Sequence, residues 1–225
     1  MQRSILFTLL AVLLAATLDA RPSNACPFCA AVSQTFSQEM ESMDVVVIAR
    51  MTKLPPPRDN TLPSDQGTDV KAKFEAVQVL KGENIFNGKL PIETLYFGDG
   101  GVGKEYLIMA VRETPESNRL QWTTPMLLSE RGKAYLLKLP TLPKEGHDRL
   151  AFFEKYLEDK DEMLARDSYD EFANAPYEAV KNLKDTMNHD QLVKWIQNED
   201  IPASRRRLYL TMLGVCGTHA DLPLL

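Results

Sequence analysis

The segment from Asp44 to Met51, DVVVIARM, contains a short apolar run bounded by charged residues. Five consecutive apolar positions are too few for a buried helix, and most of these side chains are β-branched, which favours a strand. The pattern predicts the first strand of a small β-barrel, around which the first half of the chain is organised.

Alternating apolar and charged positions predict the next strand from Val70 to Leu80, ending at Lys81-Gly82. The proline-rich stretch between Leu54 and Gly67 separates it from the first strand as a loop. Further β patterns occur at 90–96, 106–111, 120–124 and 133–139. Short strands separated by turn-rich loops predict a sandwich or a closed barrel.

Helical periodicity flanks these strands on both sides. Phe28, Val32, Phe36 and Met40 recur every four residues and predict a helix ending near Ser42, whose aromatic side packs on the barrel. From Pro143 onward the strand signals stop, and apolar residues at helical spacing predict five helices. Their apolar positions are Leu150, Phe153 and Leu157; Leu164, Ser168 and Phe172; Tyr177, Val180 and Leu183; Leu192, Val193 and Ile196; and Tyr209, Met212, Leu213 and Cys216.

Residues 1–25 have the pattern of a signal peptide. Arg3 gives a short positive region, an uncharged apolar run follows, and small residues stand at two cleavage positions, after Ala20 or after Ala25. The polar residues 21–24 disfavour lipidation of Cys26. No later apolar stretch reaches the roughly 20 residues of a transmembrane helix. We therefore expect a protein exported to the periplasm, the cell surface or the medium.

The overall charge narrows the choice of partners. The chain has 225 residues and a formal net charge of −5, and Arg205 to Arg207 is its main basic cluster. This balance disfavours nucleic acid and anionic membranes, which bind clustered lysine and arginine.

The mature chain begins near Cys26-Pro27-Phe28-Cys29. A C-x-x-C in an exported protein has three interpretations: a structural disulfide, a redox-active pair or half of a metal site. The motif resembles the active site of glutaredoxins, but no strand precedes it as in the thioredoxin-like fold. The oxidising compartment favours the structural disulfide.

Cys216 and His219 offer a second pair of candidate ligands. Together with Cys26 and Cys29 they have the composition of a Cys3His zinc site. Cys216, however, follows the apolar face of its predicted helix, where a cysteine acts as a small buried side chain. We therefore predict no metal and no cofactor.

Two other patterns are not expected to be catalytic. Gly98 to Lys104, GDGGVGK, matches the glycine spacing of phosphate-binding loops, but a β-rich run follows it instead of a helix, so a hairpin loop is predicted. Seven acidic residues between Glu158 and Glu171 are distributed around helical faces, which predicts a solvated surface. No G-x-S-x-G or H-E-x-x-H motif is present.

The chain from Cys26 to Glu130 resembles the netrin-like domain of tissue inhibitors of metalloproteinases. The resemblance rests on the cysteine near the mature N-terminus, Asp44-Val45-Val46, Val79-Leu80-Lys81-Gly82 and Gly103 to Ile108. It implies a five-stranded OB-type barrel with packed helices. In the inhibitors the N-terminal cysteine chelates the catalytic zinc of the protease, a role that Cys26 matches only after cleavage behind Ala25. The inhibitors use C-x-C with disulfides into the barrel, whereas residues 30–215 contain no cysteine.

The segment from Arg205 to Leu225 resembles a HEAT-type helical repeat, and the whole chain resembles uncharacterised exported planctomycete proteins. Because the sequence stops at LPLL within a predicted helix, we expect either a longer protein or a partner that completes the last repeat.

These observations predict an α+β protein with a signal peptide at 1–25, an OB-like barrel at 26–142 and a helical-repeat region at 143–225. The leading functional hypothesis is non-catalytic binding of a protein partner. Two alternatives are thiol-disulfide exchange by Cys26 and Cys29, and metalloprotease inhibition through Cys26.

Overall fold

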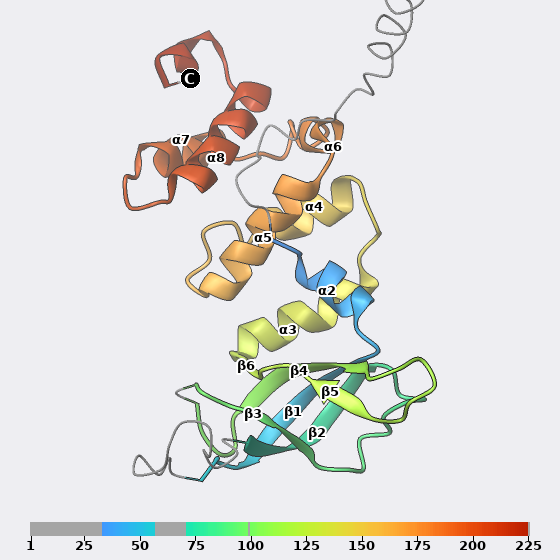
Figure 1. Cartoon of the computed structure of the whole chain (residues 1–225). Helices are drawn as coiled ribbons and strands as arrows, with labels where there is room; N and C mark the ends of the chain where they lie inside the picture. The colour runs from blue at the N-terminus through green and yellow to red at the C-terminus, as the bar shows by residue number, and fades with distance from the viewer. Residues whose placement is uncertain (1–32, 57–70, 99, 225) are drawn as a thin grey trace, which may run out of the picture.

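The computed structural model describes residues 33–56, 71–98 and 100–224. In this part of the chain an antiparallel barrel is followed by a helical region (Figure 1). The strands are β1 (Val45–Lys53), β2 (Lys71–Lys81), β3 (Ile92–Leu95), β4 (Glu105–Arg112), β5 (Leu120–Trp122) and β6 (Met126–Leu127). The helices are α2 (Phe36–Ser42), α3 (Glu130–Lys138), η1 (Leu139–Thr141), α4 (His147–Glu154), α5 (Glu162–Asn174), α6 (Tyr177–Lys181), α7 (His189–Gln197), α8 (Ala203–Cys216) and η2 (His219–Leu224). The α+β fold class is confirmed.

The strands pair in the order β3-β2-β1-β4-β5, and β6 extends the pairing along β4. The two edges approach each other where the Thr94 hydroxyl of β3 donates to the carbonyl oxygens of Trp122 (3.4 Å) and Thr123 (3.1 Å). These side-chain bonds stand in for a backbone ladder between β3 and β5. The sheet is therefore a nearly closed barrel.

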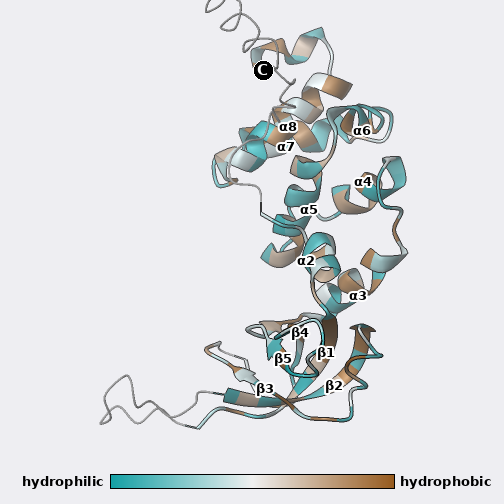
Figure 2. Ribbon diagram, turned by 45° about the vertical axis from the view of Figure 1, so that its right-hand side comes forward, coloured by the Kyte–Doolittle hydropathy of each residue, from teal (hydrophilic) through white to brown (hydrophobic). Residues whose placement is uncertain are grey.

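β1 is buried on both faces, which explains its continuous apolar run. Val45, Val47 and Ala49 point into the barrel core, whereas Val46 and Ile48 contribute to the core shared with the helices. Figure 2 shows β1 coloured as hydrophobic along this run. Because successive side chains of a strand alternate between faces, a strand with two buried faces shows no alternation in its sequence.

The N-terminal helix is shorter than predicted. Residues 33–35 are not helical and α2 begins at Phe36, because Thr35 closes a capping box with Gln38. The Thr35 hydroxyl accepts from the Gln38 amide (3.3 Å), and the Gln38 side chain accepts from the Thr35 amide (3.1 Å). The predicted end at Ser42 and the packing of Phe36 and Met40 toward the barrel are confirmed. Phe28 and Val32 lie outside the described residues.

The predicted strand at 133–139 is wrong, because this segment belongs to the helix α3 and to η1. Ser129 caps α3 by accepting from the Gly132 amide (2.9 Å). Tyr135 then packs against the rings of Phe152, Phe153 and Tyr156, and Leu136 is buried in the same apolar cluster. A short apolar run fits a buried helix as well as a buried strand, and the cap decides between them.

The predicted hairpin at Gly98 to Lys104 is also wrong, because β3 pairs with β2 and β4 pairs with β1. The segment instead crosses the end of the barrel from one strand to the other. The β-rich sequence after this segment predicted a strand instead of a helix, and β4 does begin at Glu105.

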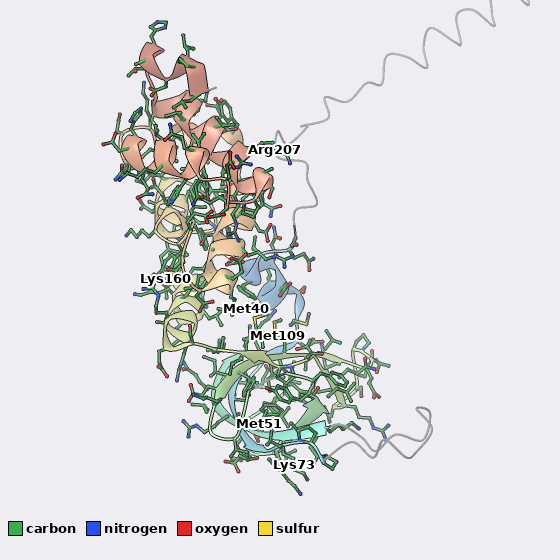
Figure 3. The ribbon with its side chains drawn as sticks, turned by 90° about the vertical axis from the view of Figure 1, so that its left-hand side faces the viewer. Met40, Met51, Lys73, Met109, Lys160 and Arg207 are labelled. Carbon is green, nitrogen blue, oxygen red and sulfur yellow. The ribbon has the colours of Figure 1, made fainter. Side chains whose placement is uncertain are left out.

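The helical region extends away from the barrel, with α2 and α3 next to the barrel and α7 and α8 farther away (Figure 1). The helices predicted around Leu150, Leu164, Val180, Leu192 and Tyr209 correspond to α4, α5, α6, α7 and α8. One apolar cluster runs without a break from the outer face of β1 and β4 to α8. Figure 3 shows Met40 of α2 and Met109 of β4 at the junction, with Met51 deeper in the barrel.

Candidate binding surface at the barrel end

Only part of the predicted site falls within the described residues. Cys26 and Cys29 lie outside them, so the disulfide, redox and zinc hypotheses are not tested. Cys216 is the last residue of α8 and is partly buried, and His219 is exposed at the start of η2. Burial raises the pKa of the Cys216 thiol, which disfavours the reactive thiolate at neutral pH.

No group of three or more His, Cys, Asp or Glu side chains within the described ranges is placed to hold a metal ion. His189 instead pairs with Asp221 (2.9 Å), whose carboxylate also accepts from the amide and hydroxyl of Thr218. The side-chain hydrogen bonds to Asp190 and Asp221 raise the pKa of His189. This pair connects α7 to η2.

The acidic residues of α5 differ from expectation, because Asp167, Asp170 and Glu171 are buried rather than solvated. Asp167 accepts from the Phe36 amide (2.7 Å) and from the Tyr135 hydroxyl (2.6 Å). Burial raises the pKa of Asp167 to about 6, although these two hydrogen bonds oppose the shift. Asp167 therefore links α5 to the start of α2 and to α3.

Glu171 forms a second buried connection. The Arg149 guanidinium of α4 binds both carboxylate oxygens of Glu171 (2.9 and 2.6 Å) and donates to the Ser37 hydroxyl of α2 (2.9 Å). Arg149 therefore joins α4 to α5 through Glu171 and to α2 through Ser37.

At the other end of the molecule, three aromatic rings pack beside Gly100 in the connection between β3 and β4. Phe74, Tyr96 and Tyr106 pack edge to face inside the barrel, with ring centroids 5.3 to 6.3 Å apart. The Tyr96 and Tyr106 hydroxyls lie 3.1 Å apart, and the Gly100 amide donates to Tyr96 (2.6 Å). Burial raises the pKa of Tyr106, so the hydroxyl stays neutral.

Several large apolar side chains at the same end of the barrel are exposed to solvent. Tyr96 points inward, so Phe97 points outward and is 68% exposed, and Val102 is 59% exposed. Leu95 of β3 and Leu54 just beyond β1 are also exposed. The Gly103 amide donates to the Met51 carbonyl (2.8 Å), which holds the Val102 segment beside the end of β1.

We call these four residues, Leu54, Leu95, Phe97 and Val102, the barrel-end surface. Register places Leu95 and Leu54 at the same end of the sheet, because Leu95 pairs with Lys71 at the start of β2, and Lys53, before Leu54, pairs with Lys73. Exposed apolar side chains gathered at one end of a fold are typical of interaction sites. Sequence reasoning missed this surface, although Leu95 and Phe97 occupy outward positions of the alternation Ile92, Thr94, Tyr96.

Comparison with models of protein families, with curated proteins and with solved structures found no match. Neither the netrin-like nor the HEAT resemblance gains support from relatives. Within the described ranges, no helix is both long and apolar enough to cross a membrane.

Proposed function

We propose that this chain is an exported, non-catalytic protein that binds a protein partner through the barrel-end surface. The observation that carries the proposal is the exposure of Phe97 and Val102 next to anchored residues: Tyr96 is buried and accepts from the Gly100 amide, and the Gly103 amide donates to Met51. A rigid apolar contact loses little conformational entropy on binding, and large exposed side chains supply the hydrophobic contact.

Two features support the finer fold assignment. The pairing of β1 with β2 and β4, and the contact of β3 with β5, follow the strand order of OB-type barrels, which bind ligands on one face and its flanking loops. Within the predicted repeat from Arg205 onward, the helix α8 is followed by the short 3-10 helix η2, which is compatible with two consecutive helices of a repeat. Export itself rests on the signal-peptide pattern of residues 1–25.

The two alternative functions depend on Cys26 and Cys29 and remain predictions. Barrel-end binding needs neither a free thiol nor a free N-terminal cysteine.

Site-specific photo-crosslinking in cells that produce the protein tests the proposal. A photoreactive phenylalanine analogue replaces Phe97 in one variant and the exposed Glu83 in a matched control. Glu83 lies just after the end of β2, whereas the barrel-end surface lies near the start of that strand. We expect a discrete protein adduct from position 97 and none from position 83. Equal adducts from both positions, or none from either, would contradict the proposal.

The partner identified in this way is then bound to the purified protein. We expect the double variant F97S/V102S to bind at least about tenfold more weakly, because it loses two apolar side chains that the complex would bury. Its circular dichroism should match that of the unaltered protein, because neither side chain contributes to the core.

A further inference from the structure

Three acidic side chains of α5 are buried at the contact between this helix and α2. Asp167 and Asp170 are each 4% exposed, and Glu171 is 7% exposed. Figure 1 shows α2 between α5 and α3. The proposed function makes no use of this contact, which lies in the helical region and not at the barrel end.

The three carboxyl groups differ in how their charge is balanced. Glu171 has the close cation Arg149, whereas the Arg166 guanidinium lies 3.9 Å from Asp170 and belongs to a side chain that is 67% exposed. Asp167 forms no ion pair within the described ranges. A buried carboxylate without a cation loses its hydration, and carboxylates three and four residues along the same helix repel it. The position of Asp167 therefore favours the neutral acid.

Two of these carboxyl groups attach the beginning of α2 to α5. The Phe36 amide, the first of α2, donates to Asp167 (2.7 Å), and the Ser33 amide donates to Asp170. Arg166 adds a bond to the Ser33 hydroxyl (2.9 Å). The groups that are expected to bind protons are thus the same groups that hold the chain at the start of α2.

The neutral form of Asp167 keeps both of its hydrogen bonds. Its carbonyl oxygen accepts from the Phe36 amide, and its hydroxyl donates to the Tyr135 oxygen. The Tyr135 hydroxyl then turns to the Ser168 hydroxyl, 3.4 Å away. Burial raises the pKa of Tyr135, so this hydroxyl keeps its proton throughout. Proton uptake therefore costs no contact between α2, α3 and α5.

Charged and titratable groups from five helices face this contact. They are Glu39 of α2, Tyr135 of α3, Arg149 of α4, Arg166, Asp170 and Glu171 of α5, and Arg205 of α8. Burial raises the pKa of Asp170 and of Glu39, as it does for Asp167, although Arg166 opposes the shift of both. The acids of the contact therefore respond to pH in the same direction.

We propose that Asp167 makes the contact between α2 and α5 pH-sensitive: it takes up a proton in mildly acidic solution, and this uptake tightens the attachment of α2. Opening of the contact exposes the carboxyl group to water, where it releases the proton. Acid therefore favours the closed contact. The proposal is independent of the barrel-end surface, so either one can be disproved without the other.

The sign of the effect follows from proton linkage. The pKa of Asp167 is about 6 in the folded protein, compared with an ordinary value of 3.8. Because the folded state binds the proton more tightly than the unfolded state, stability is gained as the pH falls through 6 and is lost again as the pH rises. Between pH 7.5 and 5.0 this difference amounts to about a tenfold change in the folding equilibrium constant.

A titration of the unaltered mature chain, followed by NMR at the side-chain carboxyl carbon of Asp167, tests proton uptake without any variant. We expect a midpoint near pH 6 instead of the value near 4 that is usual for aspartate. A midpoint below about pH 5 would overturn the proposal.

The substitution D167N tests the effect on the contact, because the amide imitates the neutral acid. In urea unfolding between pH 7.5 and 5.0, the folding equilibrium constant of the unaltered protein should rise about tenfold more than that of D167N. D185N is the matched control at an exposed aspartate, and it should follow the unaltered protein within about twofold. Equal pH dependence of the unaltered protein and D167N would contradict the role of Asp167.

Hydrogen exchange at the Phe36 amide reports on the attachment of α2 itself. Its protection, corrected for the intrinsic exchange rate at each pH, should rise about tenfold from pH 7.5 to 5.0 in the unaltered protein and in D185N. In D167N it should stay nearly constant. Protection that does not rise in the unaltered protein would show that protonation leaves the contact as it was, and the proposal would fail.

Discussion

Gly100 shows how a single residue without a side chain holds the connection between β3 and β4. A Cβ atom there would lie 1.9 Å from the Tyr106 hydroxyl oxygen and 2.6 Å from that of Tyr96. Both hydroxyls belong to the aromatic core, and Tyr96 also accepts from the Gly100 amide (2.6 Å). Gly100 is therefore required for lack of space and not for its backbone angles. The glycine of this segment with a positive φ is Gly103.

We expect Gly100→Ala to lower the free energy of unfolding by about 2 kcal/mol, because the added methyl group separates the two tyrosines or displaces the loop. Gly101→Ala is the matched control, since a Cβ at Gly101 meets nothing within 4 Å. It should change stability by less than about 0.5 kcal/mol. Urea denaturation of both variants measures the difference, and similar midpoints would show that the tyrosine contact does not constrain this segment.

At the scale of elements, the helices next to the barrel are joined by buried charges as well as by apolar contacts. Arg149 reaches from α4 to Glu171 of α5 and Ser37 of α2, and its guanidinium lies 5.1 Å from the Phe153 ring centroid. Glu171 is 7% exposed. Loss of the arginine leaves a carboxylate in the interior without its cation, which costs more than loss of the pair.

Arg149→Met should therefore lower the free energy of unfolding by about 3 kcal/mol, and R149M/E171Q should recover part of that loss. The exposed pair between Lys181 and Glu178 (2.7 Å) gives the comparison: Glu178→Gln should cost less than about 0.5 kcal/mol. Thermal or urea unfolding decides, and equal costs for R149M and E178Q would mean that the buried pair contributes no more than a surface pair.

The same scale shows which features the sequence could predict. Strand alternation located β2, and helical spacing located α4, α5, α7 and α8, because each element has one apolar face. The pattern failed for α3, whose run from Ala134 to Leu137 is apolar all round, and for the acidic residues of α5. Asp167 and Glu171 look like surface residues in sequence, since their partners Tyr135 and Arg149 come from other helices.

The candidate sites followed the same division. Local spacing identified Cys26, Cys29, Cys216 and His219, but the barrel-end surface arises from long-range assembly. Phe97 is exposed because its neighbour Tyr96 is buried against Tyr106 of another strand. No local sequence pattern contains this contact between β3 and β4.

At the scale of the whole molecule, the barrel and the helical region share one apolar core. Val46 and Ile48 of β1 and Leu107 and Met109 of β4 belong to the same cluster as Met212 of α8. A second cluster fills the barrel interior, and β1 and β4 contribute to both. The shared strands couple the two clusters, because unfolding of β1 or β4 removes side chains from both clusters at once.

This coupling predicts a single cooperative unfolding transition, although the sequence divides the chain near residue 142. The two tryptophans report on the two parts: Trp122 packs against Phe86 in the barrel (5.1 Å between ring centroids), and Trp195 packs on Tyr209 in the helical region. We unfold two single-tryptophan variants in urea: W195F, followed through Trp122, and W122F, followed through Trp195. Within each variant, the midpoint of the fluorescence change should equal the midpoint of the circular dichroism change. Separate transitions within one variant, with its fluorescence and its circular dichroism disagreeing, would mean that the core shared at β1 and β4 is too weak to couple barrel and helices.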